Sequence, residues 1–270
     1  MIGGRRPLRP LRPPAPRRLR RRLPWWPLLV VAAPLAGWLA WRAVDDGTAT
    51  QAAPPDMAFD APVGERITGA RCFMVVVDES ASMADADGTG ARADAVAAAR
   101  DFLAAHGLAD DRIGVTWFAD SADVEGPALA SVGASTSAPA DLTPLGTGTN
   151  IASALQQTVA AQQRGCASAK PVIVLVSDGQ ASSDSQFALT AEALKVAGSG
   201  LDVHLIAMNG NAAFESARAF WSDPALGLDS IETVTSFGRG EVAAAMAQIL
   251  TLETGQQVGA SGADATKATS

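Results

Sequence analysis

The sequence is poor in histidine, cysteine and tyrosine. Among 270 residues there is no tyrosine, and there are two histidines and two cysteines. His106 precedes Gly107, a predicted helix end, and His204 lies inside a predicted strand, where a hydrogen-bonded core residue is expected rather than a general base. The G-x-S-x-G pattern of a nucleophile elbow is also missing around Ser80. These absences argue against a serine hydrolase.

Acidic residues are absent from the first 43 residues, which contain ten arginines. Residues 1–43, which we call the head, therefore carry a formal charge of +10. Residues 44–270, which we call the body, contain the remaining 11 basic and all 28 acidic residues and carry −17. A body of this charge repels phosphate, which argues against nucleic acid as its partner.

An uncharged run of 19 residues extends from Leu23 to Trp41, long enough to cross a bilayer as a helix. Tryptophans at both ends of the run, at positions 25, 26, 38 and 41, favour the two membrane interfaces. Nine arginines precede the run, so we predict a cytoplasmic N-terminus at 1–22, a transmembrane signal-anchor helix at 23–43 and an extracytoplasmic remainder. The alternative is a cleaved signal peptide, which would make the protein secreted.

The rest of the chain divides into three parts. Residues 44–66 are polar and without periodicity, as in a linker, and residues 253–270 have the composition of a disordered tail. Between them, at 67–252, strand-like and helix-like segments alternate. Strands are predicted at 72–77, 112–118, 171–177, 201–208 and 231–236, with a weaker one within 121–130 as a hairpin partner of the second. Helices are predicted at 91–107, 149–163, 184–198, 211–221 and 240–252.

This alternation predicts an α/β, doubly wound domain with a mainly parallel, six-stranded sheet and helices on both faces. In such a sheet, binding sites form beyond the carboxyl ends of the strands, where the strand order reverses.

The stretch VVVDESASM, residues 75–83, places oxygen-bearing side chains at the end of an apolar strand. Asp78 follows this strand, and Asp178 follows the apolar strand 171–177 in the same way. If the two strands are neighbours, the carboxylates lie close together and repel, so that one takes a proton or a cation sits between them. Ser80 and Ser82 add neutral oxygens, and a site of oxygens alone suits Mg²⁺, Mn²⁺ or Ca²⁺.

A third segment, PLGTGTNIASAL at 144–155, is a glycine-rich turn that leads into a helix. Thr149 is predicted to begin that helix, where its hydroxyl either faces the same rim or serves as the N-cap. From that segment alone, the N-cap is the better interpretation. The turn lacks the G-x-x-x-x-G-K-[ST] pattern of a phosphate-binding loop.

Together these segments resemble the von Willebrand factor type A (vWA) family, which has a Rossmann-like fold. DESAS resembles the D-x-S-x-S motif of that family's metal-ion-dependent adhesion site (MIDAS), which also uses a later threonine and a later aspartate, usually followed by glycine. Asp78, Ser80, Ser82, Thr149 and Asp178 match this pattern in order. Ala81 departs from the glycine of many members without removing a ligand. The resemblance covers about residues 70–252 and looks like the bacterial, membrane-anchored members.

The resemblance implies that these five residues hold the metal, directly or through water, with one coordination position left for an acidic residue of a protein partner. Two aspartates only balance a divalent ion, which leaves it able to accept such a carboxylate. The family comparison also implies that the last helix, 240–252, moves on binding. The expected function is therefore metal-dependent protein–protein interaction, in adhesion or complex assembly, without catalytic residues or an enzymatic activity.

Several alternatives stay open. In the first alternative, the metal site is structural or vestigial and the domain serves as an assembly scaffold. In the second, the protein is a phosphatase of the haloacid-dehalogenase type. Such a phosphatase needs an acid where this chain has Ser80. An intracellular partner of an AAA⁺ ATPase, another role in this superfamily, conflicts with the predicted membrane span. The segment 84–90, with Asp85 and Asp87, is predicted to be a solvated loop, and a second cation site there is the less favoured interpretation.

The two cysteines are predicted to form a disulfide. Cys72 begins the strand that leads to Asp78, and Cys166 lies shortly before the strand that leads to Asp178. If these strands are parallel neighbours, both cysteines lie at the rim opposite the metal, and an exported domain permits the bond.

Overall fold

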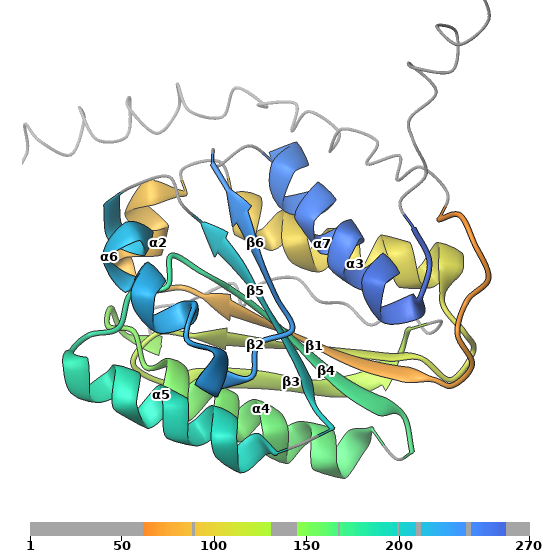
Figure 1. Ribbon diagram of the computed structural model, residues 1–270, viewed down its shortest axis with the longest axis horizontal. Coiled ribbons are helices and arrows are strands. Elements are labelled where there is room, and N and C mark those ends of the chain that lie inside the picture. Colours follow the sequence, from red (N-terminus) through yellow and green to blue (C-terminus); the bar gives the residue numbers. More distant parts are fainter. Residues whose placement is uncertain are drawn as a thin grey trace, which may run out of the picture. The chain divides into compact units, whose positions relative to one another are not determined.

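The structure is a computed structural model that describes residues 62–87, 90–130, 145–166, 168–198, 200–208, 212–235 and 239–257. These residues form one six-stranded sheet with helices on both faces, as the sequence predicts (Figure 1). In order across the sheet, the strands are β3 (Ala122–Leu129), β2 (Arg112–Phe118), β1 (Arg71–Asp78), β4 (Lys170–Ser177), β5 (Asp202–Met208) and β6 (Ser230–Val234). The sheet is mixed, since β3 is antiparallel to β2 and the other neighbours are parallel.

The central strands β1 and β4 are apolar on both sides because helices cover both faces of the sheet. In β1, Phe73, Val75 and Val77 belong to one hydrophobic core, and Met74 and Val76 belong to the other. This is the period-two alternation of a strand. At the edge of the sheet, β3 is only half-buried and includes Pro127, which an edge strand tolerates because it has an unpaired side.

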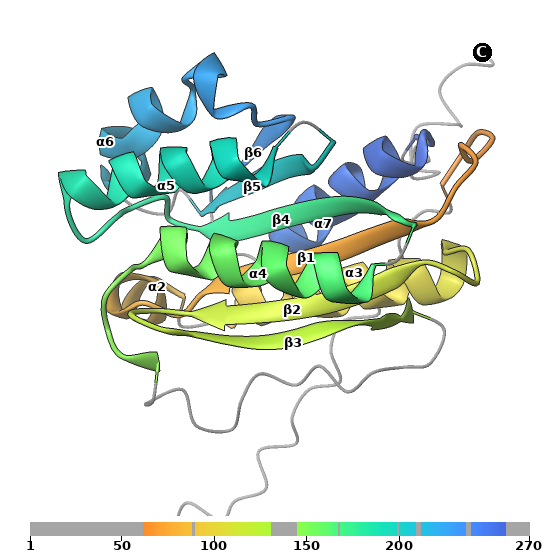
Figure 2. The ribbon, with the colours of Figure 1, turned by 90° about the horizontal axis from the view of Figure 1, so that it is seen from below.

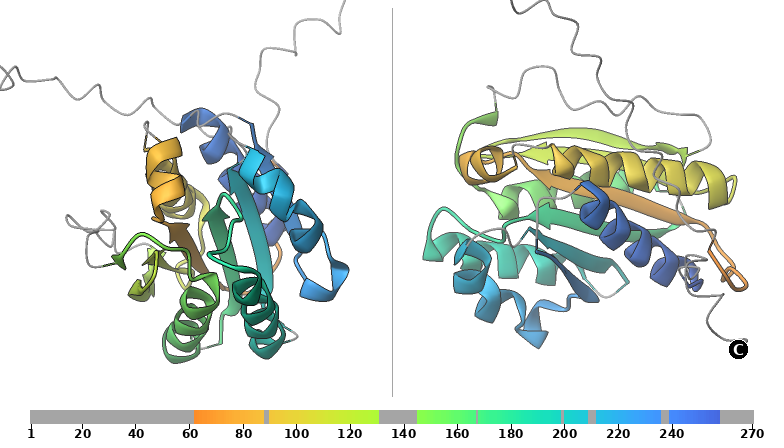
Figure 3. Two further views of the ribbon diagram at one scale, coloured as in Figure 1. Left: turned by 90° about the vertical axis from the view of Figure 1, so that its left-hand side faces the viewer. Right: turned by 90° about the horizontal axis from the view of Figure 1, so that it is seen from above.

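The helices form two layers. On one face lie α3 (Ala91–His106) and α7 (Arg239–Thr254), side by side (Figures 1 and 3). On the other lie α4 (Ile151–Gly165) and α5 (Asp184–Ala197), seen in front of the sheet in Figure 2, and α6 (Ala212–Trp221) adds buried side chains to the same core. The predicted helices are thus present, with ends shifted by up to two residues at each end.

Two short elements were not predicted, namely α2 (Ala81–Ala86) and the 3₁₀ helix η3 (Pro224–Leu226). Helix α2 lies at the end of the sheet to which β1, β2 and β4 point (Figure 2). The prediction of a solvated loop at 84–90 is wrong at Asp87, which is 5% exposed and binds the first backbone amides of α3. A six-residue helix has too few turns to show a periodic pattern, so sequence analysis misses it.

Ordered structure begins before and ends after the predicted range 67–252. Val63 and Gln257 form an antiparallel bridge, and the amide of Ile67 donates to the carbonyl of Thr254 over 2.9 Å. Within the described ranges, no helix combines the length and the apolar character needed to cross a membrane. The predicted signal-anchor at 23–43 lies outside those ranges, as do the N-terminus at 1–22, most of the linker and most of the tail.

Cys72 and Cys166 form the predicted disulfide, with their Cα atoms 5.6 Å apart. Cys72 lies in β1 beside Pro171 of β4, and Cys166 ends α4. Both side chains are buried. The bond therefore joins β1 to α4 at the rim of the sheet opposite Asp78.

Replacing both cysteines with alanine should lower the free energy of unfolding by about 2–5 kcal/mol, because the bond closes a loop with a sequence separation of 94 residues in the unfolded chain. Urea unfolding of the two proteins measures the difference. Labelling of free thiols in the folded, non-reduced wild type would contradict the bond.

Candidate metal centre

The parallel pairing of β1 and β4 places Asp78 and Asp178 at the same rim of the sheet. Val77 is opposite Val176 in the register, so both strands end at nearly the same level. Both carboxylates are fully buried. The hydroxyl of Ser177 donates to Oδ2 of Asp78 over 2.6 Å, which connects the two strand ends directly. The structure thus brings together the two aspartates that the sequence predicts as neighbours.

The two carboxylates differ in their hydrogen bonds. Oδ1 of Asp78 accepts from the amide of Ser80 at 2.9 Å, and Oδ2 accepts from Ser177. Oδ1 of Asp178 accepts from the amide of Gln180 at 3.0 Å, whereas Oδ2 of Asp178 is buried without a hydrogen-bond partner. A buried carboxylate oxygen without a donor is costly, and a bound cation or a proton on the carboxylate pair offsets this cost.

Burial also changes the protonation of Asp78. It raises the pKa of this carboxyl from 3.8 to about 7, mainly because the charged form loses its hydration. Hydrogen bonds from Ser177 and Ser80 act in the opposite direction, and the negative charge of Asp178 adds to the increase. Without a cation, the site therefore holds a proton more readily than an ordinary aspartate does.

Ser80 and Ser82 lie at the start of α2, with hydroxyl oxygens 3.1 Å apart. Ser80 occupies the N-cap position of this helix but makes no side-chain capping bond, so its hydroxyl is not used to satisfy the helix. Ser80 is buried beside Asp78, whereas Ser82 is exposed. The pair leads from the buried carboxylates to the surface.

Thr149 is not the N-cap of α4. That role belongs to Asn150, whose side chain accepts from the amide of Ser153 at 3.1 Å. The backbone of Thr149 is held instead by Ser182, whose hydroxyl accepts from its amide at 2.8 Å and donates to its carbonyl at 3.1 Å. The interpretation of Thr149 as a cap is therefore wrong, and its hydroxyl is left for another role.

The loop before Thr149 is attached to the D-x-S-x-S segment. The amide of Ala81 donates to the carbonyl of Thr147 over 3.1 Å. Asp120 accepts from the amides of Thr147 and Gly148 at 3.0 and 3.1 Å and contacts Gly148 so closely that a Cβ atom there would overlap its carboxylate. The glycine-rich turn is thus bonded both to Asp120 and to the segment between Ser80 and Ser82.

Gly179, directly after Asp178, adopts a φ of +75°. A Cβ atom at this position would meet the rings of Phe214 and Trp221, and the indole nitrogen of Trp221 donates to the Gly179 carbonyl over 2.8 Å. The D-G pair therefore reflects a tightly packed turn that only glycine fits.

Four residues outside the predicted ligand set organise this centre. Ser177, Asp120 and Ser182 hold predicted ligands or the loops that carry them. Glu79 pairs with Arg92 of α3, with Nε to Oε1 at 2.9 Å. The only sequence signal for Ser177 is its place between an apolar strand and Asp178. The partners of the other three are 13 or more residues away in the chain.

The donor set suits a hard divalent cation. The five predicted ligands, Asp78, Ser80, Ser82, Thr149 and Asp178, which we call the candidate metal centre, offer two carboxylates and three hydroxyls. In the described part of the chain, no group of three or more histidine, cysteine, aspartate or glutamate side chains is placed to hold a metal. The two carboxylates would therefore need neutral oxygens to complete a site, and the hydroxyls of Ser80, Ser82 and Thr149 are the side chains that the sequence predicts for this role.

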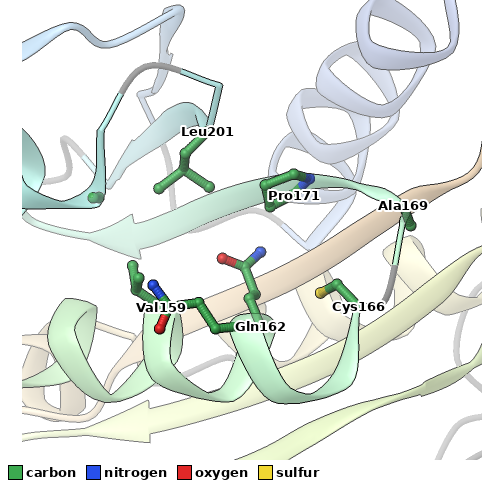
Figure 4. Close-up of a pocket in the computed structure, with 8 residues that line it drawn as sticks. Val159, Gln162, Cys166, Ala169, Pro171 and Leu201 are labelled. Carbon is green, nitrogen blue, oxygen red and sulfur yellow. The ribbon is translucent and has the colours of Figure 1, made fainter.

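A separate cavity of about 170 Å³ lies at the opposite rim, beside the disulfide (Figure 4). Its lining residues come mainly from α4 and from the segments that begin β4 and β5, and Gln162 points into this region. The Gln162 amide already donates to the carbonyls of Cys72 and Val172 at 3.2 and 3.0 Å. The cavity therefore lies at the packing interface between α4 and the sheet.

Comparisons with known proteins agree with this fold. Residues 73–180 match the model of a family described as von Willebrand factor type A domain. The pilus adhesin SpaC from Lactobacillus rhamnosus GG superposes with a TM-score of 0.55 at 16% identity, over 71% of this chain and 31% of that chain. The minor pilin PilB from Streptococcus sanguinis gives 0.55 at 17% identity, over 72% of this chain and 63% of that chain.

This chain thus spans less than two thirds of either structure, and at these identities the likeness shows the fold. No curated protein matches the sequence. The described domain has a vWA-like fold, and its β1, α3, β2 and β4 lie within or almost within the matched residues.

In the absence of metal, the free energy of unfolding should fall as the pH rises from about 4 to about 7. In this window the folded state keeps a proton on Asp78 that the unfolded chain has lost, and above about pH 7 both states have lost it. The fall in the free energy of unfolding that comes from this residue is at most about 4 kcal/mol. Urea unfolding in EDTA at several pH values measures it.

The matched variant is Asp78→Asn, which cannot ionise. Its stability should vary less with pH than that of the wild type between pH 4 and 7. Equal slopes for the two proteins would contradict the raised pKa.

Proposed function

We propose that this protein binds a protein partner through a divalent cation held by Asp78, Ser80, Ser82, Thr149 and Asp178. The observation that carries the proposal is the buried, unpartnered Oδ2 of Asp178 beside the equally buried Asp78. Burial of two ionised carboxylates is costly without a positive charge beside them. A Mg²⁺, Mn²⁺ or Ca²⁺ ion would supply that charge and is the kind of ion that oxygen ligands bind.

The accessible side of the centre indicates where a partner would approach. Asp78, Asp178 and Ser80 are buried, and Ser82 is exposed. Two carboxylates balance the charge of a divalent ion without excess, so a bound ion would supply one attractive position for an acidic side chain of the partner. We therefore expect the partner to present a carboxylate on the side of Ser82.

The comparisons support a role in protein–protein interaction. The two similar structures are described as a pilus adhesin and a minor pilin. For this chain, adhesion or assembly of a complex is part of the proposal. Magnesium is the metal that we propose first, because hydroxyl and carboxylate oxygens suit it.

The surroundings of Asp78 favour binding over phosphoryl transfer. A phosphatase of the haloacid-dehalogenase type needs a second acid to protonate the leaving group. Position 80 is serine, and the nearby Glu79 is held in an ion pair by Arg92. Neither residue offers a free carboxyl group at the carboxylate pair, so we propose no enzymatic activity.

We also propose that the domain lies outside the cytoplasm, anchored by one membrane span at 23–43. The disulfide between Cys72 and Cys166 supports this location, because such bonds persist in oxidising compartments. The charge difference between the arginine-rich head and the acidic body supports the orientation.

Saturating Mg²⁺ or Mn²⁺ should stabilise the wild-type domain at pH 7.5, by about 2.7 kcal/mol when the free ion is at 100 times its Kd. Asp178→Asn should lose most of this gain, because it removes the unpartnered oxygen. The matched control is Asp184→Asn, an exposed carboxylate at the start of α5 that is not a predicted ligand. Urea unfolding with the ion and with EDTA provides the comparison.

The same three proteins test partner binding. A membrane-derived partner should be retained in Mg²⁺ by the wild type and by Asp184→Asn, and released by EDTA or by Asp178→Asn. Stabilisation by the ion combined with equal retention in EDTA would indicate a structural metal and a scaffold role. No stabilisation at all would overturn the metal centre.

The membrane anchor has its own test. The full chain should stay in the membrane fraction during alkaline carbonate extraction, because 19 consecutive uncharged residues bury a span in the bilayer. A variant that lacks 23–41 should be soluble. Recovery of the full chain in the soluble fraction, shortened at its N-terminus, would show cleavage and secretion instead.

A further inference from the structure

Arg92, in the first turn of α3, connects the two ends of the segment that carries Ser80 and Ser82. Its Nε donates to Oε1 of Glu79 at 2.9 Å, and its Nη2 lies 2.8 Å from Oε2 of the same carboxylate. Its Nη1 lies 3.9 Å from Oδ2 of Asp87. Glu79 directly follows Asp78, and Asp87 directly follows α2. The guanidinium group is therefore hydrogen-bonded to Glu79 and makes a charge–charge contact with Asp87, since Nη1 has no hydrogen-bond partner, and we call Arg92, Glu79 and Asp87 the Arg92 cluster.

The contact between Arg92 and Glu79 has the geometry of a strong ion pair. Two parallel N–H groups meet the two oxygens of one carboxylate, and the side chains are 13% and 3% exposed. Such bidentate pairs fix direction as well as distance, and water competes little at this burial. Glu79 is thus held against the first turn of α3.

Asp87 attaches the far end of the segment to the same helix. Its Oδ1 accepts from the amide of Ala91 at 2.8 Å, and its Oδ2 accepts from the amide of Arg92 at 2.9 Å. These are the amides that a helix N-terminus leaves without intrahelical partners. Both ends of the segment are therefore anchored on the first turn of α3.

The segment between these ends has little support of its own. Helix α2 has six residues, far fewer than an isolated helix needs to be stable, and its N-cap Ser80 makes no side-chain capping bond. The hydroxyls of Ser80 and Ser82 contact each other. Their positions therefore depend on contacts with other segments, namely the Arg92 cluster, the bond from the Ala81 amide to Thr147 and the packing of the buried Met83.

We propose that Arg92 is a positioning residue of the candidate metal centre, which holds Ser80 and Ser82 in a ligand-ready arrangement through Glu79 and Asp87. This inference rests on the proposed function, because it concerns the ligands of the same ion. Arg92 touches none of the five predicted ligands through a described hydrogen bond, so its effect is indirect.

The direction in which the Kd for the metal changes when Arg92 is replaced distinguishes a positioning role from a purely electrostatic one. A positive charge near a cation site weakens cation binding, so removal of the Arg92 charge alone would tighten it. Loss of a residue that orients metal ligands instead weakens metal binding, typically by 10–100-fold. The two explanations therefore predict opposite changes in the Kd.

The test uses the domain with its disulfide intact and Mn²⁺ alone as the probe, titrated by calorimetry at pH 7.5. Arg92→Gln should raise the Kd for Mn²⁺ by about 10–100-fold. Arg92→Lys, which keeps the charge but not the paired N–H groups, should also raise it. Hydrogen exchange without metal should be faster at the amides of residues 80–87 in Arg92→Gln than in the wild type.

The matched control is Arg66→Gln. Arg66 forms a similarly buried ion pair with Asp111, at 12% and 0% exposure and 2.6 Å, and it binds the carbonyl of His106 at the end of α3 that is remote from the metal centre. This variant should lose stability without a change in the Kd for Mn²⁺ or in exchange at 80–87. If Arg92→Gln does not fold, the double variant Glu79→Gln with Arg92→Gln removes both charges of the Glu79–Arg92 ion pair and should show the same rise in Kd.

The outcomes are distinct. Wild-type binding with an unchanged or lower Kd in Arg92→Gln overturns the positioning role and leaves the proposed function standing. An equal rise in Kd in Arg66→Gln also overturns it, since the effect would then follow general stability. Absence of Mn²⁺ binding by the wild type overturns the proposed function, and the positioning role with it.

Discussion

The parallel pairing of β1 with β4 is the interaction on which both ends of the domain depend. At the carboxyl end it places Asp78 and Asp178 at one rim, linked through Ser177. At the amino end it places Cys72 beside Pro171, within reach of Cys166 at the end of α4. Loops that follow parallel strands emerge at one rim, so the pairing gathers groups that are about 100 residues apart in the chain. A shift in this register would separate the two carboxylates.

Burial of two carboxylates at one rim is an energetic conflict that the surrounding loops only partly relieve. Donors from Ser177, Ser80 and Gln180 satisfy three of the four oxygens, and the fourth, on Asp178, has none. The pKa of Asp78, raised to about 7, expresses the same conflict as a preference for a proton. Strained or unsatisfied groups persist where a fold has a use for them. Here the adjacent hydroxyls of Ser80 and Ser82 are oxygen ligands of the kind that hard cations prefer, which points to cation binding.

Much of the fold was predictable because long apolar segments have clear periodicity. The six strands and five longer helices lie where the sequence predicts them, including β3 as the hairpin partner of β2. Helix α2 has no sequence signal because six residues show no period, and the sequence does not distinguish Thr149 from Asn150 as the cap of α4 because both residues are good caps. The roles of Asp120 and Ser182 have no local signal, since each acts on a backbone segment about 27–33 residues away.

The sequence by itself determined which residues are able to bind a cation and where the strands and helices lie. Side-chain chemistry and hydrophobic period are local properties, and both are written in consecutive residues. Only the tertiary structure decided which oxygens are left unsatisfied, that Asn150 rather than Thr149 caps α4, and that Arg92 ties Glu79 to Asp87 across the serine segment. The physical reason is that burial and hydrogen-bond partners depend on chain segments that meet only when the sheet and its covering helices pack together.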